Sequence, residues 1–403
     1  MEKTLHQPPP FWWQALRHQW QQELDSILTF WSTQMTDEVH GGFLGRRMAN
    51  GQADPLSPKG AVLNARILWT FATAAQLQER EEWRQVAIRA YNELRHRFID
   101  QQYGGVYWSI TCDGLPYQTR KQTYAQAFAI YGFAAYYQLT ADPDALKQAC
   151  ALYQLLEQNA ADHKHGGYVE AMDEQWQPLE DMRLSEKDAN LPKTMNTHLH
   201  VLEAYTLLYK VWPDASLANA IHSLLLLFLH RILQPETGTQ GLFFSMDWQR
   251  RDTLVSFGHD IEAAWLLNEA AAVRDDAGLQ GEIKNWSLTL VNKACQGIDK
   301  DGGMWNEYDL QTNHWVREKH WWPQAEAMVG FCDAWQNTGD LQYLDRCRQS
   351  WQFIQHYILQ PSLGEWKWGV DAQGSSLENE DLAGFWKCPY HNARALMELL
   401  HRL

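Results

Sequence analysis

A turn that contains glycine and is followed by aromatic or apolar residues occurs six times along the chain. This repeat constrains the possible folds more than any other feature of the sequence. The steps between successive turns are 63, 62, 75, 61 and 62 residues. A unit of about sixty residues has room for two helices of about four to five turns, a long loop and a short hairpin. The turns are centred on Gly41, Gly104, Gly166, Gly241, Gly302 and Gly364.

Each interval contains two kinds of helical pattern. One is charged and amphipathic, as in 81–100 and 214–233, and is typical of a helix with one face in water. The other is rich in small and apolar residues, as in 60–77, 123–139 and 258–273, and is typical of a helix that is buried nearly all round. Outer and inner helices therefore alternate along the sequence.

Six such pairs predict an all-α fold, an (α/α)6 barrel of twelve helices in two concentric rings with short β-hairpins in the loops. A solenoid of stacked helix pairs is the alternative. No linker rich in proline, glycine and serine divides the sequence. We therefore expect residues 1–403 to form a single domain.

Charge and hydropathy exclude two classes of partner. The chain has 34 Lys and Arg against 49 Asp and Glu, a formal charge of −15, with no dense basic run. A phosphate backbone would be repelled, so nucleic acid is not an expected partner. The longest strongly apolar run, 224–229, is too short to span a bilayer, and segment 1–13 lacks the apolar core of a signal peptide. No membrane association is expected.

The six cysteines include no CxxC pair and no framework spacing, which is typical of reduced thiols in a cytoplasmic protein. The chain also contains 21 Trp, 16 Tyr and 14 Phe. Aromatic rings can lie flat against sugar rings, although core packing alone explains most of them.

The expected inner helices all begin with polar residues. In a barrel of alternating helices, the six inner N-termini lie at one end, so these residues would surround one opening. Helix capping explains Asn, Thr, Asp and Glu at such positions, but it does not explain His, Arg and Trp. Converging polar groups predict a binding pocket. The residues concerned are Arg66, Tyr124, Asn196, His200, His259, Glu262, Trp322, Gln324, Glu326, Trp386, His391 and Arg394.

The stretch MNTHLHVLEAY, 195–205, contains two histidines two residues apart. Such residues lie on nearly opposite sides of a helix, so His198 and His200 cannot both face the pocket. Asn196, His200 and Glu203 share one face, which leaves His198 as a packing residue. Helical zinc sites use HExxH spacing, which is absent here, so no metal is expected.

Two further histidines suit proton transfer. His259 and Glu262 are three residues apart, so we expect the carboxylate to orient the imidazole. Pro389 suits the first position of the last inner helix, which places His391 in its first turn. The helix dipole would then keep His391 neutral and able to accept a proton.

The chain contains seven long motifs: LNARILWTFA, RKQTYAQAFAIYGF, HGGYVEA, MNTHLHVLEAYTLLY, SFGHDIEAAWLL, KHWWPQAEAMVGF and GFWKCPYHNAR. These motifs resemble the N-acylglucosamine 2-epimerase family, and within it the members that act on cellobiose. The resemblance implies an (α/α)6 barrel and cofactor-free epimerisation at C2 of a reducing-end sugar, as from cellobiose to glucosyl-mannose or from lactose to epilactose. It also implies an acid/base pair, His259 and His391. Residues that resemble the family's substrate-binding and supporting residues are Arg66, Tyr124, Asn196, His200, Glu262, Trp322 and Trp386.

Several alternatives remain open at this stage. The expected partner is a small sugar, either a disaccharide or free mannose or glucose, bound by a monomer or a small homo-oligomer. A mannose 2-epimerase or an aldose–ketose isomerase would use the same acid/base chemistry. A glycoside hydrolase would need two carboxylates in place of two histidines. A non-catalytic sugar-binding protein would have no use for paired histidines.

Overall fold

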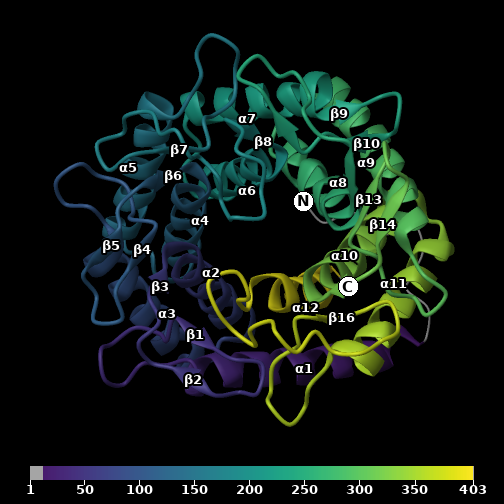
Figure 1. Cartoon of the computed structure of the whole chain (residues 1–403), viewed down its shortest axis with the longest axis horizontal. Coiled ribbons are helices and arrows are strands. Elements are labelled where there is room, and N and C mark those ends of the chain that lie inside the picture. The colour runs from purple at the N-terminus through teal and green to yellow at the C-terminus, as the bar shows by residue number, and fades with distance from the viewer. Residues whose placement is uncertain (1–11, 403) are drawn as a thin grey trace.

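A computed structural model describes residues 12–402 of the chain. Within this range twelve α-helices form two concentric rings around a common axis (Figure 1). The inner ring consists of α2 (Ala61–Gln78), α4 (Thr123–Thr140), α6 (Met195–Val211), α8 (Phe257–Ala272), α10 (Trp321–Thr338) and α12 (Tyr390–Arg402). The outer ring consists of α1 (Trp13–Thr33), α3 (Glu81–Glu93), α5 (Pro143–Asn159), α7 (Ala215–Leu227), α9 (Ala277–Ala294) and α11 (Leu341–Phe353).

Consecutive inner helices contact one another, and α12 contacts α2, so the inner ring is closed. Closure excludes the open solenoid, and the predicted (α/α)6 barrel is confirmed. Three outer helices continue into a π-helical turn and α9 continues into a short 3-10 turn. These turns are η1 (Leu94–Phe98), η2 (Phe228–Ile232), η3 (Cys295–Gly297) and η4 (Ile354–Ile358).

The inner helices are buried on almost all sides, as their composition predicts. Every residue of α4 from Thr123 to Tyr136 is buried. Two inner helices carry a glycine where a neighbouring backbone passes close by. A Cβ atom on Gly132 would lie 2.9 Å from the carbonyl oxygen of Ala65 on α2, and one on Gly330 would lie 2.9 Å from that of Ile261 on α8. Small residues therefore set the spacing of the inner ring.

Short antiparallel strands join neighbouring repeat units at the end of the barrel where the inner helices begin. The strand before each of five inner helices pairs with a strand of a following unit: β3 with β4, β6 with β7, β8 with β11, β12 with β13 and β15 with β16. The strands are β1 (Arg46–Arg47), β2 (Ala53–Asp54), β3 (Lys59–Gly60), β4 (Ser109–Ile110), β5 (Pro116–Gln118), β6 (Lys121–Gln122), β7 (Ala171–Met172), β8 (Lys193–Thr194), β9 (Leu233–Gln234), β10 (Thr239–Gln240), β11 (Phe243–Phe244), β12 (Leu254–Ser256), β13 (Glu307–Asp309), β14 (His314–Val316), β15 (Lys319–His320) and β16 (Gly369–Val370).

A buried lysine anchors the glycine turn in five of the six units. Each lysine stands just before an inner helix, is at most 2% exposed, and pairs with a carboxylate of the preceding turn. The nitrogen–oxygen distances are 3.0 Å for Lys59–Asp37, 2.6 Å for Lys121–Asp100, 2.7 Å for Lys193–Asp162, 2.7 Å for Lys319–Asp299 and 2.9 Å for Lys387–Glu365. These pairs fix the start of the inner helices and hence the side chains in their first turns.

The fourth unit departs from this pattern. Val255 stands at the place of the lysine. The turn carries its left-handed residue at Gly238, with a φ of 70°, and Gly241 has no positive φ. Instead, the side chain of Asp260 accepts a hydrogen bond from the backbone N–H of Gln240. The six glycine turns are therefore not all equivalent.

Other sequence expectations concern membranes and thiols. The segment Ala215–Ile232 is long and apolar enough by composition to cross a membrane, but in the fold it forms outer helix α7 and turn η2 and is 50% buried. None of the six cysteines forms a disulfide within residues 12–402. The expectation that no signal peptide begins the chain concerns mainly residues 1–11, which lie outside the described residues.

Candidate active site

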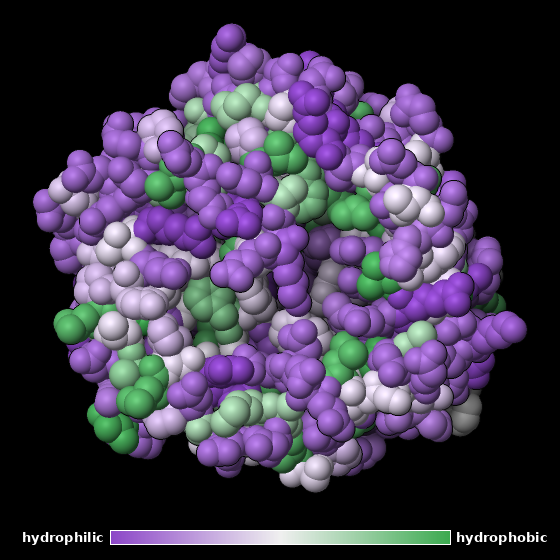
Figure 2. Space-filling model, in the orientation of Figure 1, coloured by the Kyte–Doolittle hydropathy of each residue, from purple (hydrophilic) through white to green (hydrophobic). Residues whose placement is uncertain are grey.

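The first turns of the inner helices line one pocket of about 430 Å³. Figure 2 shows a hollow near the centre of the barrel face, with mostly hydrophilic residues around it. Nine of the twelve residues that the sequence predicts around one opening lie in the wall of this pocket: Arg66, Tyr124, Asn196, His200, His259, Glu262, Trp322, Trp386 and His391. Glu326 and Arg394 lie beneath the pocket. The prediction is wrong for Gln324, because its side chain binds the backbone of Met304 and His320. A volume of this size falls within the range of about 300–1,000 Å³ that is usual for small-molecule sites.

The repeat explains why these residues meet. The sixth residue of each of five inner helices belongs to one layer across the barrel axis, and the fifth residue of α12 completes it. The layer consists of Arg66, Phe128, His200, Glu262, Glu326 and Arg394. Five of these six side chains are ionisable and all are buried. His259 and His391 each lie three residues before a member of this layer, so the two histidines occupy equivalent positions on α8 and α12.

His391 is held by a carboxylate from the neighbouring helix. Its Nδ1 lies 2.7 Å from Oε1 of Glu326 on α10, which leaves Nε2 for a bound ligand. Burial lowers the pKa of His391 well below its ordinary value, and the positive charges of Arg66 and Arg394 lower it further. The ring is therefore neutral at neutral pH and can accept a proton. The direction agrees with the dipole argument, but burial is the largest cause.

His259 has a different environment from the predicted one. Its Nδ1 lies 2.8 Å from Oγ of Ser256, the residue that precedes α8, and not against Glu262. Glu262 instead accepts a hydrogen bond from Arg394 at 2.6 Å. The expected His259–Glu262 pair is wrong, because the charged guanidinium of Arg394 is a stronger hydrogen-bond donor to Oε1 of Glu262 than a neutral imidazole is. Burial lowers the pKa of His259 to about 3, with a smaller contribution from His200.

The indole of Trp322 contacts both histidines. Its ring centroid is 4.6 Å from that of His259 and 5.6 Å from that of His391. Because Trp322 is only half-buried, its free surface faces the pocket. An aromatic plane beside two proton-accepting groups is suited to holding a flat ring or chain of a sugar in place.

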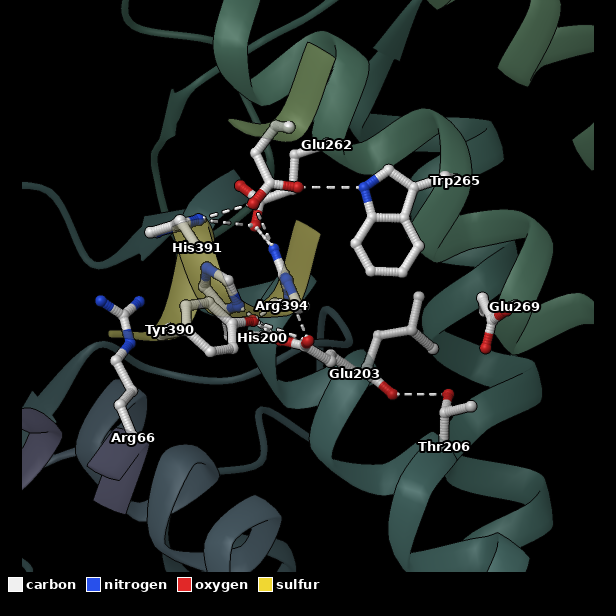
Figure 3. Close-up of polar contacts among 12 residues, drawn as sticks. Arg66, His200, Glu203, Thr206, Glu262, Trp265, Glu269, Tyr390, His391 and Arg394 are labelled. Atoms are coloured by element: carbon white, nitrogen blue, oxygen red, sulfur yellow. Dashed lines mark hydrogen bonds and ion pairs between the residues drawn. The ribbon is translucent and has the colours of Figure 1, made fainter. Parts of the chain in front are cut away.

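Arg394 organises the polar residues beneath the pocket (Figure 3). Its Nη1 donates to Oε1 of Glu203 at 2.5 Å, and its Nη2 donates to Glu262 and Glu326 at 2.6 and 2.7 Å. Tyr390 donates its hydroxyl proton to Glu203 and also lies against Arg394. Burial alone would raise the pKa of Glu203, but Arg394 and its other partners lower it to about 2, so this carboxylate is ionised.

The helical phase predicted for 195–205 is confirmed. His200 lies in the pocket wall with Nδ1 2.9 Å from Oε2 of Glu203. His198 points away from the pocket: its Nε2 accepts a hydrogen bond from the backbone N–H of Tyr168 at 2.8 Å, and its Nδ1 lies 2.6 Å from the carbonyl oxygen of Thr194. Burial lowers the pKa of His198 to about 4. His198 thus ties two repeat units together.

Arg66 is the one arginine of the layer that no carboxylate binds among the described residues. Its Nη2 donates to the hydroxyl of Tyr124 at 2.8 Å, and its guanidinium lies over the rings of Phe128 and Tyr390 at 4.1 and 4.5 Å. Arginine stays charged at all ordinary pH values. A buried guanidinium whose partners are all neutral favours a ligand that is, or becomes, negative.

Two other predicted residues offer contacts to a ligand. Asn196 is half-buried, and its side-chain oxygen accepts no hydrogen bond within the described part of the chain. Trp386 lies in the loop before α12, three residues before Pro389, which the sequence predicts as the first residue of that helix. The helix begins only at Tyr390, since Pro389 disfavours helical geometry in the residue before it. Trp386 still reaches the pocket from this loop.

Sequence reasoning missed one segment of the pocket wall and three single residues of it, Trp321, Trp368 and Glu380. Residues 184–188 cross from the third repeat unit and line the opening. Lys187 reaches Glu380 of the last unit, with 3.8 Å between Nζ and Oε1. A second cavity of about 420 Å³ lies beside this segment and shares Asn196 and His259 with the first. The signal was present in the sequence, because this segment lies in the one interval of 75 residues, where the others span 61 to 63.

One set of side chains has the composition of a metal site. Ligand atoms of Glu262, Glu326 and His391 lie within 4.8 Å of one another. However, Nη2 of Arg394 contacts both carboxylates, and its positive charge takes the place that a divalent ion would need. The donor set therefore does not fit a resident metal, and the metal-free site stays a prediction.

Comparisons with other proteins agree with this geometry. A family profile described as N-acylglucosamine 2-epimerase (GlcNAc 2-epimerase) matches residues 41–395. The cellobiose 2-epimerase of Bacteroides fragilis is 46% identical over 388 residues, which are 96% of this chain and 99% of that protein. The cellobiose 2-epimerase structure from Bacillus thermoamylovorans superposes with a TM-score of 0.92 at 34% identity, covering 97% of this chain and all of that one.

A more distant relative has a different activity. The D-mannose isomerase of Marinomonas mediterranea is 22% identical over 385 residues, which are 91% of this chain and 92% of that protein. A solved D-mannose isomerase structure superposes with a TM-score of 0.83 at 20% identity and covers 98% of this chain and all of that one. At that identity the likeness concerns the fold alone.

Proposed function

Because the chain belongs to the N-acylglucosamine 2-epimerase family and is a sugar 2-epimerase, we propose that it inverts C2 of the reducing-end glucose or mannose unit of a disaccharide, as in cellobiose or lactose. The similarity to cellobiose 2-epimerases over nearly the whole chain supports this substrate class. The activity needs no cofactor, since the chemistry consists of proton transfers.

The proposed reaction begins with an open-chain sugar, because only the free aldehyde makes the proton on C2 acidic. Removing that proton gives an enediolate, whose negative charge must be stabilised as it forms. Arg66 is suited to this task, since its guanidinium faces the pocket and no carboxylate neutralises it. Asn196 and Tyr124 offer polar groups beside the same space.

Inversion requires a proton to leave one face of C2 and another to arrive on the opposite face. His259 and His391 serve as the two proton-transfer groups in our proposal. Both line the pocket from different helices, and burial keeps both neutral at neutral pH. The observation that carries the proposal is that two neutral imidazoles from different helices both contact Trp322 in the pocket wall. One neutral histidine removes the proton and becomes an imidazolium. The other histidine first takes up a proton from solvent and delivers it to the opposite face of C2, and the imidazolium then releases its proton to solvent.

The test is a nuclear magnetic resonance screen with glucose, mannose, cellobiose, lactose and mannobiose. We expect cellobiose to give glucosyl-mannose and lactose to give epilactose, faster than either free hexose reacts. Turnover restricted to free mannose or glucose would contradict the disaccharide preference. Release of a monosaccharide from cellobiose would contradict the epimerase chemistry.

A mannose 2-epimerase or mannose isomerase is the second candidate, and the similarity to the D-mannose isomerase of Marinomonas mediterranea favours it. An isomerase would return the proton to C1 and give a ketose. The same screen distinguishes the two, because fructose or a ketose-ended disaccharide appears only if the proton moves to C1.

A further inference from the structure

Two glutamates of the layer compete for one nitrogen. Glu262 on α8 and Glu326 on α10 are at most 1% exposed, and their Oε1 atoms lie 2.6 and 2.7 Å from the same atom, Nη2 of Arg394. The other terminal nitrogen of Arg394 is engaged by Glu203. Keeping both carboxyl groups ionised this close together, out of contact with bulk water, costs much free energy.

The charges around this pair do not balance when every carboxyl is ionised. Glu203, Glu262 and Glu326 would contribute three negative charges, and Arg394 contributes one positive charge. The nearby histidines are neutral, since burial lowers the pKa of both His200 and His391. Arg66 adds one positive charge across the pocket, and Tyr390 is neutral because burial raises its pKa well above the ordinary value. One bound proton brings this set of groups to neutrality.

The hydrogen bonds show which carboxyl carries that proton. Both oxygens of Glu326 accept: Oε1 faces Arg394 and His391 at 2.7 Å each, and Oε2 accepts from Trp265 at 3.0 Å. Glu326 therefore has the surroundings of an anion. Glu262 has one donor on Oε1, and no described residue donates to its Oε2, although Glu262 lines the pocket.

We propose that Glu262 enters the reaction as a neutral carboxylic acid, with its proton on Oε2, where it donates a hydrogen bond to the sugar oxygen that becomes negative in the enediolate. Glu326 is the ionised partner and positions His391. Burial raises the pKa of both carboxyl groups, so burial alone does not distinguish them. The assignment rests on the hydrogen bonds, because Glu326 accepts on both oxygens and Glu262 on one. A carboxylic acid kept neutral by its surroundings is an effective hydrogen-bond donor to an oxyanion.

The inference rests on the epimerase activity and predicts a specific order among variants. Glu262→Gln keeps the shape, the neutral charge and an N–H donor toward the pocket, so kcat/KM should fall by less than about tenfold. Glu262→Ala removes the donor and should lose about a hundredfold or more, as oxyanion donors do. Glu326→Gln removes the anion that orients His391 and should also lose about a hundredfold. Melting temperatures of all three variants separate catalytic losses from unfolding.

Two further measurements complete the test. Because activity needs the protonated form of Glu262, the wild-type kcat/KM should fall as pH rises through its pKa, and Glu262→Gln should lack this alkaline fall. Infrared difference spectra at neutral pH should show the C=O band of a protonated carboxylic acid in the wild type that Glu262→Gln lacks. The infrared result does not depend on the sugar, so a failure to turn over cellobiose would count against the proposed substrate alone.

Three results would contradict the proposed role of Glu262. If folded Glu262→Gln loses as much activity as Glu262→Ala, the donor role of a neutral Glu262 is wrong. If Glu326→Gln retains activity while Glu262→Gln does not, the proton belongs to Glu326. If the wild-type and Glu262→Gln infrared spectra show the same carboxylic acid bands, Glu262 is ionised and the inference fails.

Discussion

At the scale of single residues, two histidines two positions apart on one helix have opposite surroundings. His200 faces the pocket beside Glu203, and His198 binds the backbone of a neighbouring repeat unit. His198 is the fourth residue of α6, and Gln126 and Gln324, the fourth residues of α4 and α10, bind the backbone of Val106 and Met304 in the same way. A polar anchor at this position is therefore a feature of the repeat, independent of catalysis.

His200→Ala and His198→Ala should separate these two roles. His200→Ala is expected to lower kcat/KM by more than about tenfold with a small change in melting temperature, because it removes a polar group from the pocket wall. His198→Ala leaves the N–H of Tyr168 unpaired and should cost about 1–3 kcal/mol of stability. Kinetic assays and thermal unfolding of both variants test this, and equal catalytic losses at unchanged melting temperatures would contradict it.

His198 also predicts a pH dependence of stability. Its folded pKa of about 4 lies below the ordinary value of 6.5, so the unfolded chain binds the proton more tightly. The stabilisation is complete above pH 6.5 and is lost as pH falls toward 4, a change of about 3 kcal/mol from this residue.

His198→Gln copies the residue at the equivalent positions 126 and 324 and cannot be protonated. Thermal unfolding between pH 7 and pH 4 should therefore show a shallower loss of stability in this variant than in the wild type. Parallel pH curves would mean that His198 does not contribute to the acid sensitivity of the fold.

At the scale of elements, glycines distinguish the inner ring from the outer one. Gly132 on α4 meets the backbone of α2, whereas a Cβ atom on Gly281 of outer helix α9 would have no atom within 4 Å. Replacing glycine by alanine should therefore destabilise the protein at Gly132 of the inner ring and stabilise it at Gly281 of the outer ring. The inner helices approach one another more closely than ordinary side chains permit, and the outer helices do not.

Gly132→Ala should destabilise the protein by about 1–3 kcal/mol, because the methyl group would lie 2.9 Å from the carbonyl oxygen of Ala65. Gly281→Ala is the matched control and should stabilise by about 0.5–1 kcal/mol through reduced entropy of the unfolded chain. Thermal unfolding of both variants provides the comparison. A rise in melting temperature for Gly132→Ala would show that the inner ring can relax around an added methyl group.

At the scale of the whole molecule, the barrel collects residues from six repeat units at one end of its axis. The ring architecture and nine residues of the pocket wall could be predicted from the sequence, because glycine spacing and helical phase are local properties of the chain. The hydrogen-bond partners of those residues could not be predicted from the sequence. Arg394 binds Glu203, 191 residues away, and nothing local pairs them. The same holds for the pairing of His259 with Ser256 in preference to Glu262, which depends on where Arg394 lies.

For the five buried lysines, the sequence predicts the position but not the burial. Lys59, Lys121, Lys193, Lys319 and Lys387 each stand just before an inner helix, a regularity visible in the sequence. Their burial is not visible, since lysine is usually exposed and only a carboxylate in the preceding turn makes its burial possible. Loop 184–188 is a similar case, because its length signals an insertion but not that it crosses the pocket.

The central claim is that His259 and His391 transfer protons on the two faces of C2, and epimerisation in D2O tests it most directly. The product formed by the wild-type enzyme should carry deuterium at C2, because the imidazoles exchange their protons with solvent between removal and return. His259→Asn and His391→Asn keep shape but remove basicity, so turnover should fall about a hundredfold or more in each. The variant that lacks only the delivering histidine should still exchange the C2 proton of the starting sugar without net epimerisation. A wild-type product free of C2 deuterium, or near-normal turnover in both Asn variants, would contradict the account.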